Sequence, residues 1–354
     1  MKLFSATKFA AAAGVIMLAV GGSAFADTVK TITGAGSTFA YPLYSKWASA
    51  YSKENGFGLN YQSIGSGGGI RQVEAGTVVF GGSDAPLKSD ELAKYGLIQF
   101  PTAVGGAIPT INLSGFKPGS IVLDGATLAD IFMGTITQWN DKAIAKLNPG
   151  VKLPDTKITV VHRSDGSGTT WIWSNYLSKV SSTWAEKLGV NTAIAWPTGV
   201  GAKGNEGVAS YVQRIPGAIG YNEYAYVIEN KMNYVSMINK AGKSVKPSAK
   251  SFQAAAANAD WVNSQDFYVV LTDQPGDESW PISGATFVLI HKQPDNADDV
   301  RAALKFFDWS FENGDDLAAA LQYVPMPHSV VSVIEETWSK NMKDSSGKSL
   351  WPMK

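Results

Sequence analysis

The 354-residue chain contains no cysteine and only three histidines. Without cysteine there are no disulfide bonds and no thiolate metal sites, and a chain of this length has enough apolar core to be stable without cross-links. The three histidines, His162, His291 and His328, lie far apart and show no spacing typical of a metal site. We therefore expect them to be ordinary polar or packing residues, and we expect no metal and no cofactor.

Positive charge is not in excess. Residues 1–26 contain Lys2 and Lys8, and the rest of the chain has 28 basic and 30 acidic side chains, a formal charge of −2. A nucleic-acid-binding protein of the usual basic type has a clear surplus of Lys and Arg. The composition therefore excludes nucleic acid as the expected partner.

A long hydrophobic run is also missing. The apolar stretch at 9–20 is about a dozen residues long, whereas a helix that crosses a membrane needs roughly 20. Two lysines precede this stretch, and the sequence Ala-Phe-Ala at 24–26 follows it. A positive start, a short apolar core and an Ala-x-Ala end are typical of a secretory signal peptide. We predict cleavage after Ala26, a mature protein that starts at about Asp27, and a periplasmic location.

The rest of the chain, roughly 328 residues, is long enough for two domains. Short β-rich runs alternate with helical segments, which is typical of an α/β protein whose sheets are covered by helices. Apolar residues recur every four positions between Phe39 and Tyr51, as on one face of a helix. The pattern predicts strands at 30–33, 58–63, 78–81, 158–162 and 286–291, and helices at 39–53, 70–75, 128–132, 141–147, 170–179 and 300–313.

Three segments place a loop rich in Gly, Ser and Thr between a strand and a helix: GAGSTF at 34–39, GSGGG at 65–69 and RSDGSGT at 163–169. The first turn of a helix has N–H groups without intrahelical partners, and the helix dipole makes that end partly positive. Such an end binds oxyanions. One loop of this kind could simply cap a helix, but three in one chain favour an anion-binding site.

The third of these loops begins with an arginine. Arg163 can donate hydrogen bonds to two oxygens of a tetrahedral anion. Asp165, two residues later, can hold the guanidinium in place. The alternative interpretation of Arg163 and Asp165 is an ordinary ion pair on the surface.

A carboxylate, Asp84, follows an apolar strand in the sequence GGSDAP at 81–86. A fixed negative charge beside an anion is unfavourable unless the anion carries a proton, whose hydrogen bond Asp84 can then accept. Hydrogen phosphate has such a proton at neutral pH and sulfate does not, and two buried acceptors that face each other are penalised. We therefore predict that Asp84 selects phosphate over sulfate. The alternative is a turn or cap residue before Pro86.

Together these segments closely resemble the periplasmic phosphate-binding proteins of ABC-type phosphate transporters, the PstS family. The resemblance runs from Thr33 almost to the C-terminus and includes, in order, 34–39, 64–69, 81–86, 124–140, 165–169, 217–226 and 280–291. It implies a type II periplasmic-binding-protein fold, with two α/β lobes joined by a hinge of two crossing strands and the ligand in the cleft. The implied boundaries are 27–112 plus 283–354 for lobe 1 and 113–282 for lobe 2, after a signal peptide at 1–26.

The resemblance also implies the contacts with phosphate. Arg163 would donate its guanidinium N–H groups, positioned by Asp165, and Asp84 would accept the proton of the phosphate. The remaining donors would be the hydroxyls of Thr38, Ser66, Ser167 and Thr169 and the backbone N–H groups of Phe39 and Gly168. The implied partners are inorganic phosphate and a membrane-embedded ABC permease. We expect a monomer that is not an enzyme, and our hypothesis is that its two lobes close on the ligand.

This sequence departs from the family pattern beside the predicted contacts. His162 stands where relatives can have a second basic residue, and Gly67 replaces a small hydroxyl residue. Both departures could change the electrostatic potential of the cleft, but neither removes a predicted contact.

Other readings of the motifs stay open at this point. Residues 199–204 fit the pattern G-x-G-x-x-G, but the segment before them is a poor strand, so the context of a dinucleotide site is missing; we expect a flexible loop before a helix at 205–214. A secreted hydrolase could use Ser167 or Thr169 as nucleophile and Arg163 as oxyanion clamp, although no general base accompanies them. A binding protein could also take sulfate, molybdate or a phosphonate, and Asp84 offers no discrimination against arsenate.

Overall fold

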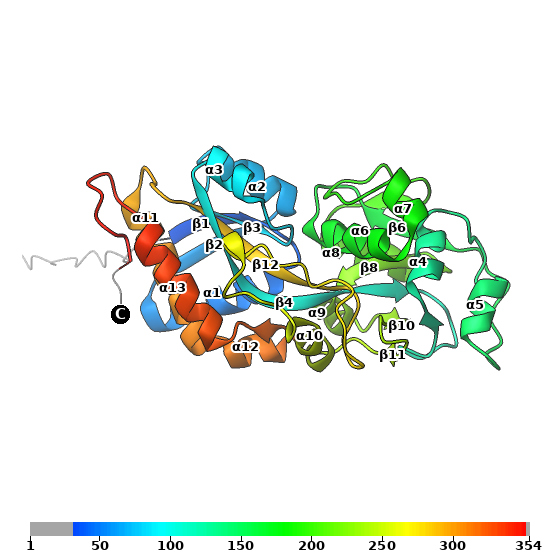
Figure 1. Ribbon diagram of the computed structural model, residues 1–354. Coiled ribbons are helices and arrows are strands. Elements are labelled where there is room, and N and C mark those ends of the chain that lie inside the picture. Colours follow the sequence, from blue (N-terminus) through cyan, green and yellow to red (C-terminus); the bar gives the residue numbers. More distant parts are fainter. Residues whose placement is uncertain (1–30, 352–354) are drawn as a thin grey trace, which may run out of the picture.

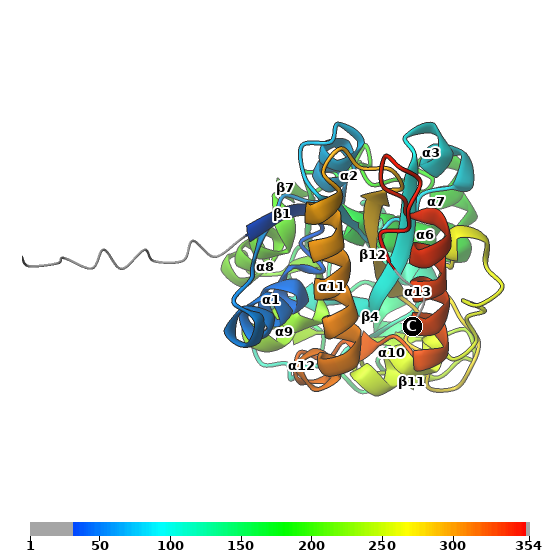
Figure 2. The ribbon, with the colours of Figure 1, turned by 90° about the vertical axis from the view of Figure 1, so that its left-hand side faces the viewer.

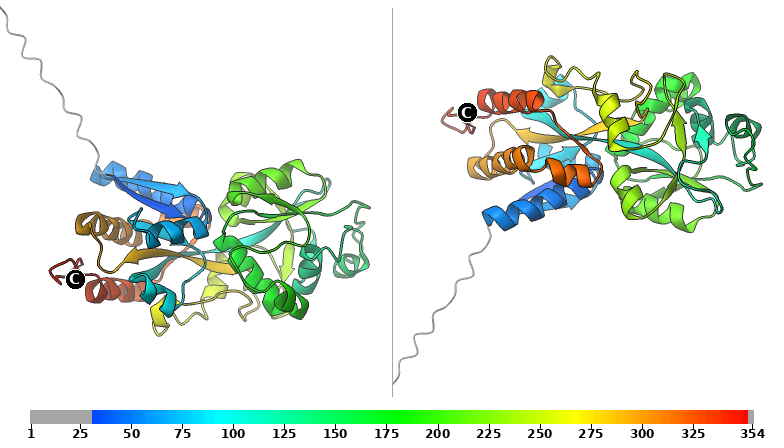
Figure 3. Two further views of the ribbon diagram at one scale, coloured as in Figure 1. Left: turned by 90° about the horizontal axis from the view of Figure 1, so that it is seen from above. Right: turned by 90° about the horizontal axis from the view of Figure 1, so that it is seen from below.

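The computed structural model describes residues 31–351, and the predicted signal peptide lies outside them. The described chain forms two α/β lobes that lie side by side, with one long strand running through both (Figure 1). Figure 3 shows from above and below that the lobes meet along this strand, β4 (Leu97–Ile111), and its neighbour β12 (Ser283–His291). Within residues 31–351, no helix is both long enough and apolar enough to cross a membrane.

Lobe 1 is built on a mixed sheet in which the order β2-β1-β3 is parallel and β12 joins β3 antiparallel. Seen from the outer end of the lobe, α11 lies between α1 and α13 (Figure 2). The strands are β1 (Thr31–Gly36), β2 (Gly58–Ser63), β3 (Phe80–Ser83), β12 (Ser283–His291) and β13 (Val324–Pro325). The helices are α1 (Tyr41–Asn55), α2 (Ser66–Glu74), α3 (Ser89–Lys94), α11 (Ala297–Asn313), α12 (Asp315–Ala320) and α13 (His328–Asn341).

Lobe 2 is built on the strands β8 (Ala218–Glu223), β6 (Thr159–Arg163) and β7 (Val200–Ala202), which are parallel to one another. Its helices are α4 (Gly125–Phe132), α5 (Lys142–Leu147), α6 (Gly168–Val180), α7 (Ser182–Lys187), α8 (Gly204–Arg214) and α9 (Tyr224–Glu229). Between α9 and β12 the chain forms β9 (Asn233–Tyr234), β10 (Ser236–Ile238), β11 (Ser244–Val245), α10 (Ala249–Ala256) and a 3₁₀ turn at Gln265–Phe267. A small sheet joins β11, β10 and β5 (Val122–Leu123).

The strand that connects the lobes is β4 (Leu97–Ile111). Its residues 97–106 pair with β12 in lobe 1, and its residues 107–111 pair with β8 in lobe 2. All 15 residues of β4 are buried. Sequence analysis missed this strand for two reasons: a strand buried on both faces shows no apolar-polar alternation, and the glycines and prolines within it normally argue against a strand.

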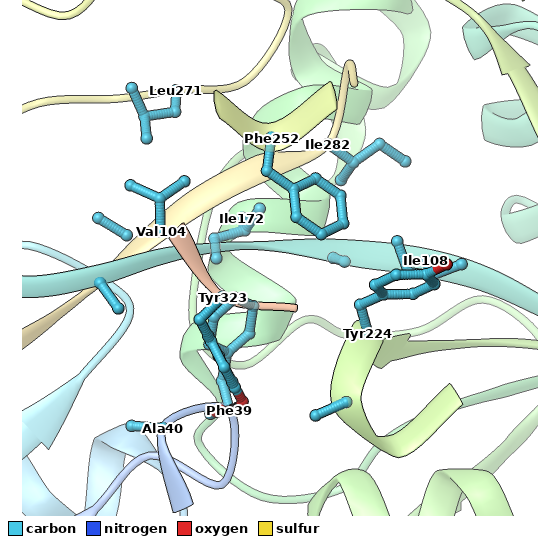
Figure 4. Packing of buried hydrophobic residues seen from close by; sticks show 14 of the residues in the cluster. Phe39, Ala40, Val104, Ile108, Ile172, Tyr224, Phe252, Leu271, Ile282 and Tyr323 are labelled. Atoms are coloured by element: carbon cyan, nitrogen blue, oxygen red, sulfur yellow. Dashed lines mark hydrogen bonds between the residues drawn. The ribbon is translucent and has the colours of Figure 1, made fainter. Parts of the chain in front are cut away.

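The glycines of β4 leave space for large side chains where the two lobes join. Gly105 pairs with Gly284 of β12. A Cβ atom on Gly105 would lie 2.9 Å from the ring of Phe39, and one on Gly106 would lie 2.3 Å from the ring of Phe252. Figure 4 shows these two rings on opposite sides of β4. Because Gly105 and Gly106 have no side chains, the rings of Phe39 and Phe252 can pack directly against the backbone of β4.

The predicted elements are present, but several begin or end elsewhere. The helix predicted at 70–75 starts at Ser66, and the helix predicted at 170–179 starts at Gly168. Both starting turns are rich in Gly, Ser or Thr, residues with low helix propensity in a sequence-based reading. The prediction of a flexible loop before the helix at 205–214 was wrong in part, because Val200–Ala202 forms β7 and pairs with β6.

We predict that Gly106→Ala destabilises the protein. The added methyl group would collide with Phe252, which is fully buried, and overpacking of this kind costs about 1–3 kcal/mol in the free energy of unfolding. Urea denaturation monitored by circular dichroism measures the change. Gly207→Ala in α8 is the matched control: its Cβ has ordinary contacts of 3.4 Å, so we expect a neutral or slightly stabilising effect. Equal stability of Gly106→Ala and the unchanged protein would contradict this packing argument.

Candidate functional site

The predicted anion-binding segments meet where the two lobes face each other. From lobe 1 come the loop after β1, the start of α2 and the end of β3; from lobe 2 come the end of β6 and the start of α6. The predicted side chains are all buried, with at most 3% of their surface exposed: Thr38, Phe39, Ser66, Asp84, Arg163, Ser167 and Thr169. The structure therefore brings all of the predicted positions, with Gly168, to one buried place between the lobes.

The two lobes are in direct contact at this place. A Cβ atom on Gly168, the first residue of α6, would lie 2.4 Å from Ser66 Oγ and 2.6 Å from Asp84 Oδ2. The backbone N–H of Gly67 donates to the carbonyl of Gly166 at 2.9 Å, also from lobe to lobe. Only glycine at position 168 allows the start of α6 to come so close to Ser66 and Asp84.

The start of α6 is shaped by its N-cap. Ser167 Oγ accepts a hydrogen bond from the N–H of Thr170 at 3.0 Å, so its own hydroxyl proton can be donated elsewhere. The helix has 13 residues, and its N-terminal N–H groups carry the positive end of the dipole. Gly168 places this end of α6 beside Ser66 and Asp84.

Arg163 is held rigidly at the end of β6. Its Nε donates to Asp165 Oδ1 at 2.7 Å and its Nη2 donates to Oδ2, while its Nη1 lies 3.4 Å from Thr169 Oγ1. Burial disfavours both charges, but their mutual attraction outweighs it, so the pKa of Arg163 is raised and the pKa of Asp165 is lowered. The Arg163 side chain is 1% exposed, which excludes the alternative of a surface ion pair.

Asp84 is a buried carboxylate with few partners. Its Oδ1 accepts a hydrogen bond from Ser37 Oγ at 2.5 Å, and its Oδ2 lies 3.5 Å from Ser66 Oγ. Burial raises the pKa of Asp84 to about 6, against the opposing effect of the hydrogen bond from Ser37. The group is therefore mostly ionised at neutral pH and acts as a hydrogen-bond acceptor, although holding that charge is costly.

Sequence analysis missed Asn205, which links the predicted residues of the two lobes. Its backbone N–H and its Nδ2 donate to Thr38 Oγ1 at 3.2 and 2.7 Å, and Nδ2 also reaches Thr169 Oγ1 at 3.3 Å. Its side-chain oxygen accepts from the N–H of Glu223 at 2.9 Å. Asn205 lies in the first turn of α8, and its polarity gave no sign that it would be fully buried.

Sequence analysis also missed two tyrosines, because nothing near them in the sequence indicates their contacts with the predicted site residues. Tyr226 donates its hydroxyl to the carbonyl of Thr38 at 2.7 Å and so fixes the loop after β1 against lobe 2. Tyr221 accepts a hydrogen bond from the N–H of Arg163 at 3.1 Å and stacks on Trp173. Both aromatic side chains look like ordinary core residues in the sequence, but both support the backbone of predicted site residues.

His162 does not belong to the site. Its ring stacks on Trp196 with the centroids 4.8 Å apart, and burial lowers its pKa. This packing role agrees with the expectation for the histidines and gives Ser167 no histidine base of the type that the hydrolase alternative needs. Among residues 31–351, no three His, Asp or Glu side chains gather in a way that could hold a metal ion. An open pocket of about 590 Å³ between β1 and the start of α11 contains none of the predicted site residues.

Comparison with known proteins relates the whole chain to one family. Residues 21–313 match a family model described as a PBP superfamily domain. The phosphate-binding protein PstS of Pasteurella multocida is 52% identical over 338 residues, covering 95% of this chain and 98% of that protein. PstS of Xylella fastidiosa strain 9a5c is 55% identical over 312 residues, covering 88% and 86%. PstS of Haemophilus influenzae is 49% identical and covers 92% and 98%.

Solved structures show the same fold at lower identity. A periplasmic phosphate-binding protein called PfluDING, solved with bound phosphate, has a TM-score of 0.69 at 21% identity and covers 87% of this chain and 94% of its own. A human phosphate-binding apolipoprotein has a TM-score of 0.71 at 19% identity and covers 90% and 99%. At these identities the likeness establishes the fold, here the two-lobed arrangement of periplasmic binding proteins.

We predict that Asp84→Asn stabilises the anion-free protein at pH 7.5. The folded-state pKa of Asp84 is raised from 3.8 to about 6, so its contribution to stability is complete below about pH 3.8 and is lost as the pH rises through about 6. Removing the charge should increase the free energy of unfolding by roughly 2–3 kcal/mol above pH 6.

The expected gain decreases between pH 6 and pH 4 and is close to zero at pH 4, which urea denaturation at several pH values measures. Asp155→Asn, at an exposed loop carboxylate, is the control and should change stability by less than about 0.5 kcal/mol. A gain from Asp84→Asn that is the same at pH 4 and pH 7.5 would show that the charge is not its cause.

Proposed function

Because this chain belongs to the PstS family of phosphate-binding proteins, we propose that it holds one hydrogen phosphate ion between its lobes and delivers it to an ABC-type permease. The chain is a binding protein and not an enzyme. The main support for the ligand is one pair of buried groups. Arg163 is a fixed donor in lobe 2, and Asp84 is a fixed acceptor in lobe 1, so the site suits an anion that also carries a proton.

The donors proposed for phosphate come from both lobes. Lobe 2 supplies the guanidinium of Arg163, which Asp165 positions, together with the hydroxyls of Ser167 and Thr169 and the N–H of Gly168. Lobe 1 supplies the hydroxyls of Thr38 and Ser66 and the N–H of Phe39. Hydroxyls and backbone N–H groups supply donors without adding a full charge. Since Asp165 already matches the charge of Arg163, these neutral donors would contribute much of the stabilisation of the anion.

Asp84 is proposed to give the site its selectivity. Its carboxylate would accept the hydrogen bond of the proton on hydrogen phosphate, while the same carboxylate facing a bare sulfate oxygen would leave two buried acceptors in opposition. Ser37, which donates to Oδ1, keeps the carboxylate oriented. Selection between the two anions thus depends on a proton and not on size or total charge.

Ligand binding is proposed to close the lobes. Each lobe alone offers only part of the hydrogen-bonding shell, so an ion that contacts both binds the closed arrangement more tightly and shifts the population toward it. The lobe-to-lobe hydrogen bonds of Gly67, Asn205 and Tyr226 would form at the same step. The permease would then recognise the surface that only the closed protein presents.

The remaining features of the proposal concern the chain as a whole. The proposed lobe boundaries are 27–112 plus 283–354 and 113–282; β4 passes from its pairing with β12 to its pairing with β8 after Gly106, and β12 begins at Ser283. A cleaved signal peptide at 1–26 and a monomeric state in the periplasm complete the proposal, with no nucleic acid as partner. Sulfate, molybdate and phosphonates remain the competing ligands, and calorimetry separates them from phosphate.

We predict that the anion-stripped protein binds phosphate tightly in a one-to-one complex and shows no heat with sulfate, when each is titrated at neutral pH in a calorimeter. Asp84→Asn should weaken phosphate binding by roughly 10- to 150-fold, the effect of one hydrogen bond to a charged group. It should also let sulfate bind, because the amide can donate as well as accept.

Asp155→Asn serves as the control here also and should bind like the unchanged protein. If the unchanged protein binds both anions, the selectivity assigned to Asp84 is wrong. If the folded, anion-free protein binds neither, the assignment of phosphate itself is wrong.

We predict that Gly168→Ala weakens phosphate binding by at least about 100-fold, because the new methyl group would stand within 2.4–2.6 Å of Ser66 Oγ and Asp84 Oδ2 and keep the lobes apart. The lobes can relieve the collision by separating, so the protein should stay folded. Small-angle X-ray scattering should show a radius of gyration that phosphate no longer decreases. Gly207→Ala is the control, and unaltered affinity in Gly168→Ala would contradict the proposed closed geometry.

A further inference from the structure

An open pocket of about 590 Å³ lies on the seam between the lobes, next to the buried site. One wall is formed by α2 of lobe 1, with Gly68, Arg71 and Gln72, and the other by the loop 164–166 and Lys203 of lobe 2. Arg71 and Lys203 are both exposed to solvent. The pocket therefore has one cation on each lobe, and the proposed contacts with phosphate include neither of them.

Very little structure separates this pocket from the buried site. A Cβ atom on Gly67 would lie 3.5 Å from Arg71 Nη1 and 3.1 Å from the Cα of Gly166, so the guanidinium of Arg71 lies beside the hydrogen bond that joins the lobes. Asp165 lines the pocket and also holds Arg163 inside the site. An ion that enters between the opened lobes on this side has to pass Arg71 and Lys203.

The charge of this pocket is positive. Asp165 is the one carboxylate among its lining residues, and Arg163 already matches that charge. Within residues 31–351, neither Arg71 nor Lys203 forms an ion pair shorter than 4 Å. Two carboxylates lie nearby without lining this pocket. Glu74 lines the pocket between β1 and α11 and interacts electrostatically with Arg71, and Glu206 accepts a hydrogen bond from Ser63 and lies beside Gly204.

We propose that Arg71 and Lys203 form an electrostatic vestibule that draws hydrogen phosphate to the open cleft and raises its association rate. The inference rests on the proposed function of the buried site. The mature chain has a formal charge of −2, so an approaching anion meets a weakly repulsive protein except where cations gather locally, and such a local potential increases association rates. Because both cations stay in water, salt screens them and they add little to the affinity of the closed complex.

The test is the rate of phosphate binding to the full mature protein and to Arg71→Gln, Lys203→Gln and the double variant. Stopped-flow tryptophan fluorescence can follow binding, since Trp173 stacks on Tyr221 directly behind Arg163. At an ionic strength of about 20 mM the double variant should associate roughly 3- to 10-fold more slowly, and at about 0.5 M the difference should fall below about 1.5-fold. The dissociation rate should stay within about twofold.

The matched control is Lys46→Gln, which removes the same charge from an exposed lysine of α1 at a different interlobe pocket. It should leave the association rate within about 1.5-fold. Dissociation measured by isotope chase, combined with calorimetric affinity, gives the association rate independently of any optical signal.

Either of two results would overturn the proposed vestibule. The first is an association rate in the double variant that equals that of the unchanged protein at low salt. The second is a change confined to a faster dissociation rate, which would mean that the two cations stabilise the closed complex. An equal effect of Lys46→Gln would also count against it, because the steering would then come from overall charge. If the unchanged protein does not bind phosphate, the proposed function fails instead, so the two failures are distinguishable.

Discussion

The hydrogen bonding of one continuous strand to both lobes determines where the site lies. In the order β3-β12-β4-β8-β6, Asp84 follows a strand two places from β4 on one side, and Arg163 ends a strand two places from β4 on the other. The acceptor and the donor therefore face each other across β4 from equivalent positions in the two lobes. Neither lobe can form the complete site, yet the shared strand keeps both halves aligned.

Charge in the buried site is balanced locally and not by a surplus of cations. Asp165 pairs with Arg163, and Asp84 remains a buried acceptor whose ionisation burial opposes. The donors that remain are hydroxyls and the N–H groups at the start of α6, which bring no net charge of their own. In the proposed function this arrangement lets Asp84 distinguish a protonated anion from an unprotonated one, while the cations Arg71 and Lys203 line a separate pocket outside the buried site.

The sequence was informative where local chemistry decides the structure. Gly-Ser-Thr loops at helix starts have a local physical meaning, so the segments around Thr38, Ser66 and Ser167 could be recognised from the sequence, and Asp84 could be recognised as a carboxylate that directly follows an apolar strand. β4 could not, because its burial on both faces erases the alternation by which strands are recognised. Asn205 was equally hidden: it bonds Thr38, which is 167 positions away, and nothing in its own neighbourhood indicates that contact. The resemblance to a family supplied the two-lobed arrangement, which no local pattern contains.

The glycine pair at the centre of the molecule has a mechanical consequence. Where β4 and β12 pair beside the junction of the lobes, Gly105 lies opposite Gly284, and Phe39 and Phe252 fill the space beside β4. The connection between the lobes is therefore a pair of strands with aromatic rings packed against it (Figure 4), and not an exposed flexible linker. Rotation of one lobe against the other therefore has to rearrange these packed rings as well as change the backbone torsion angles of β4, so close packing at the junction opposes the rotation.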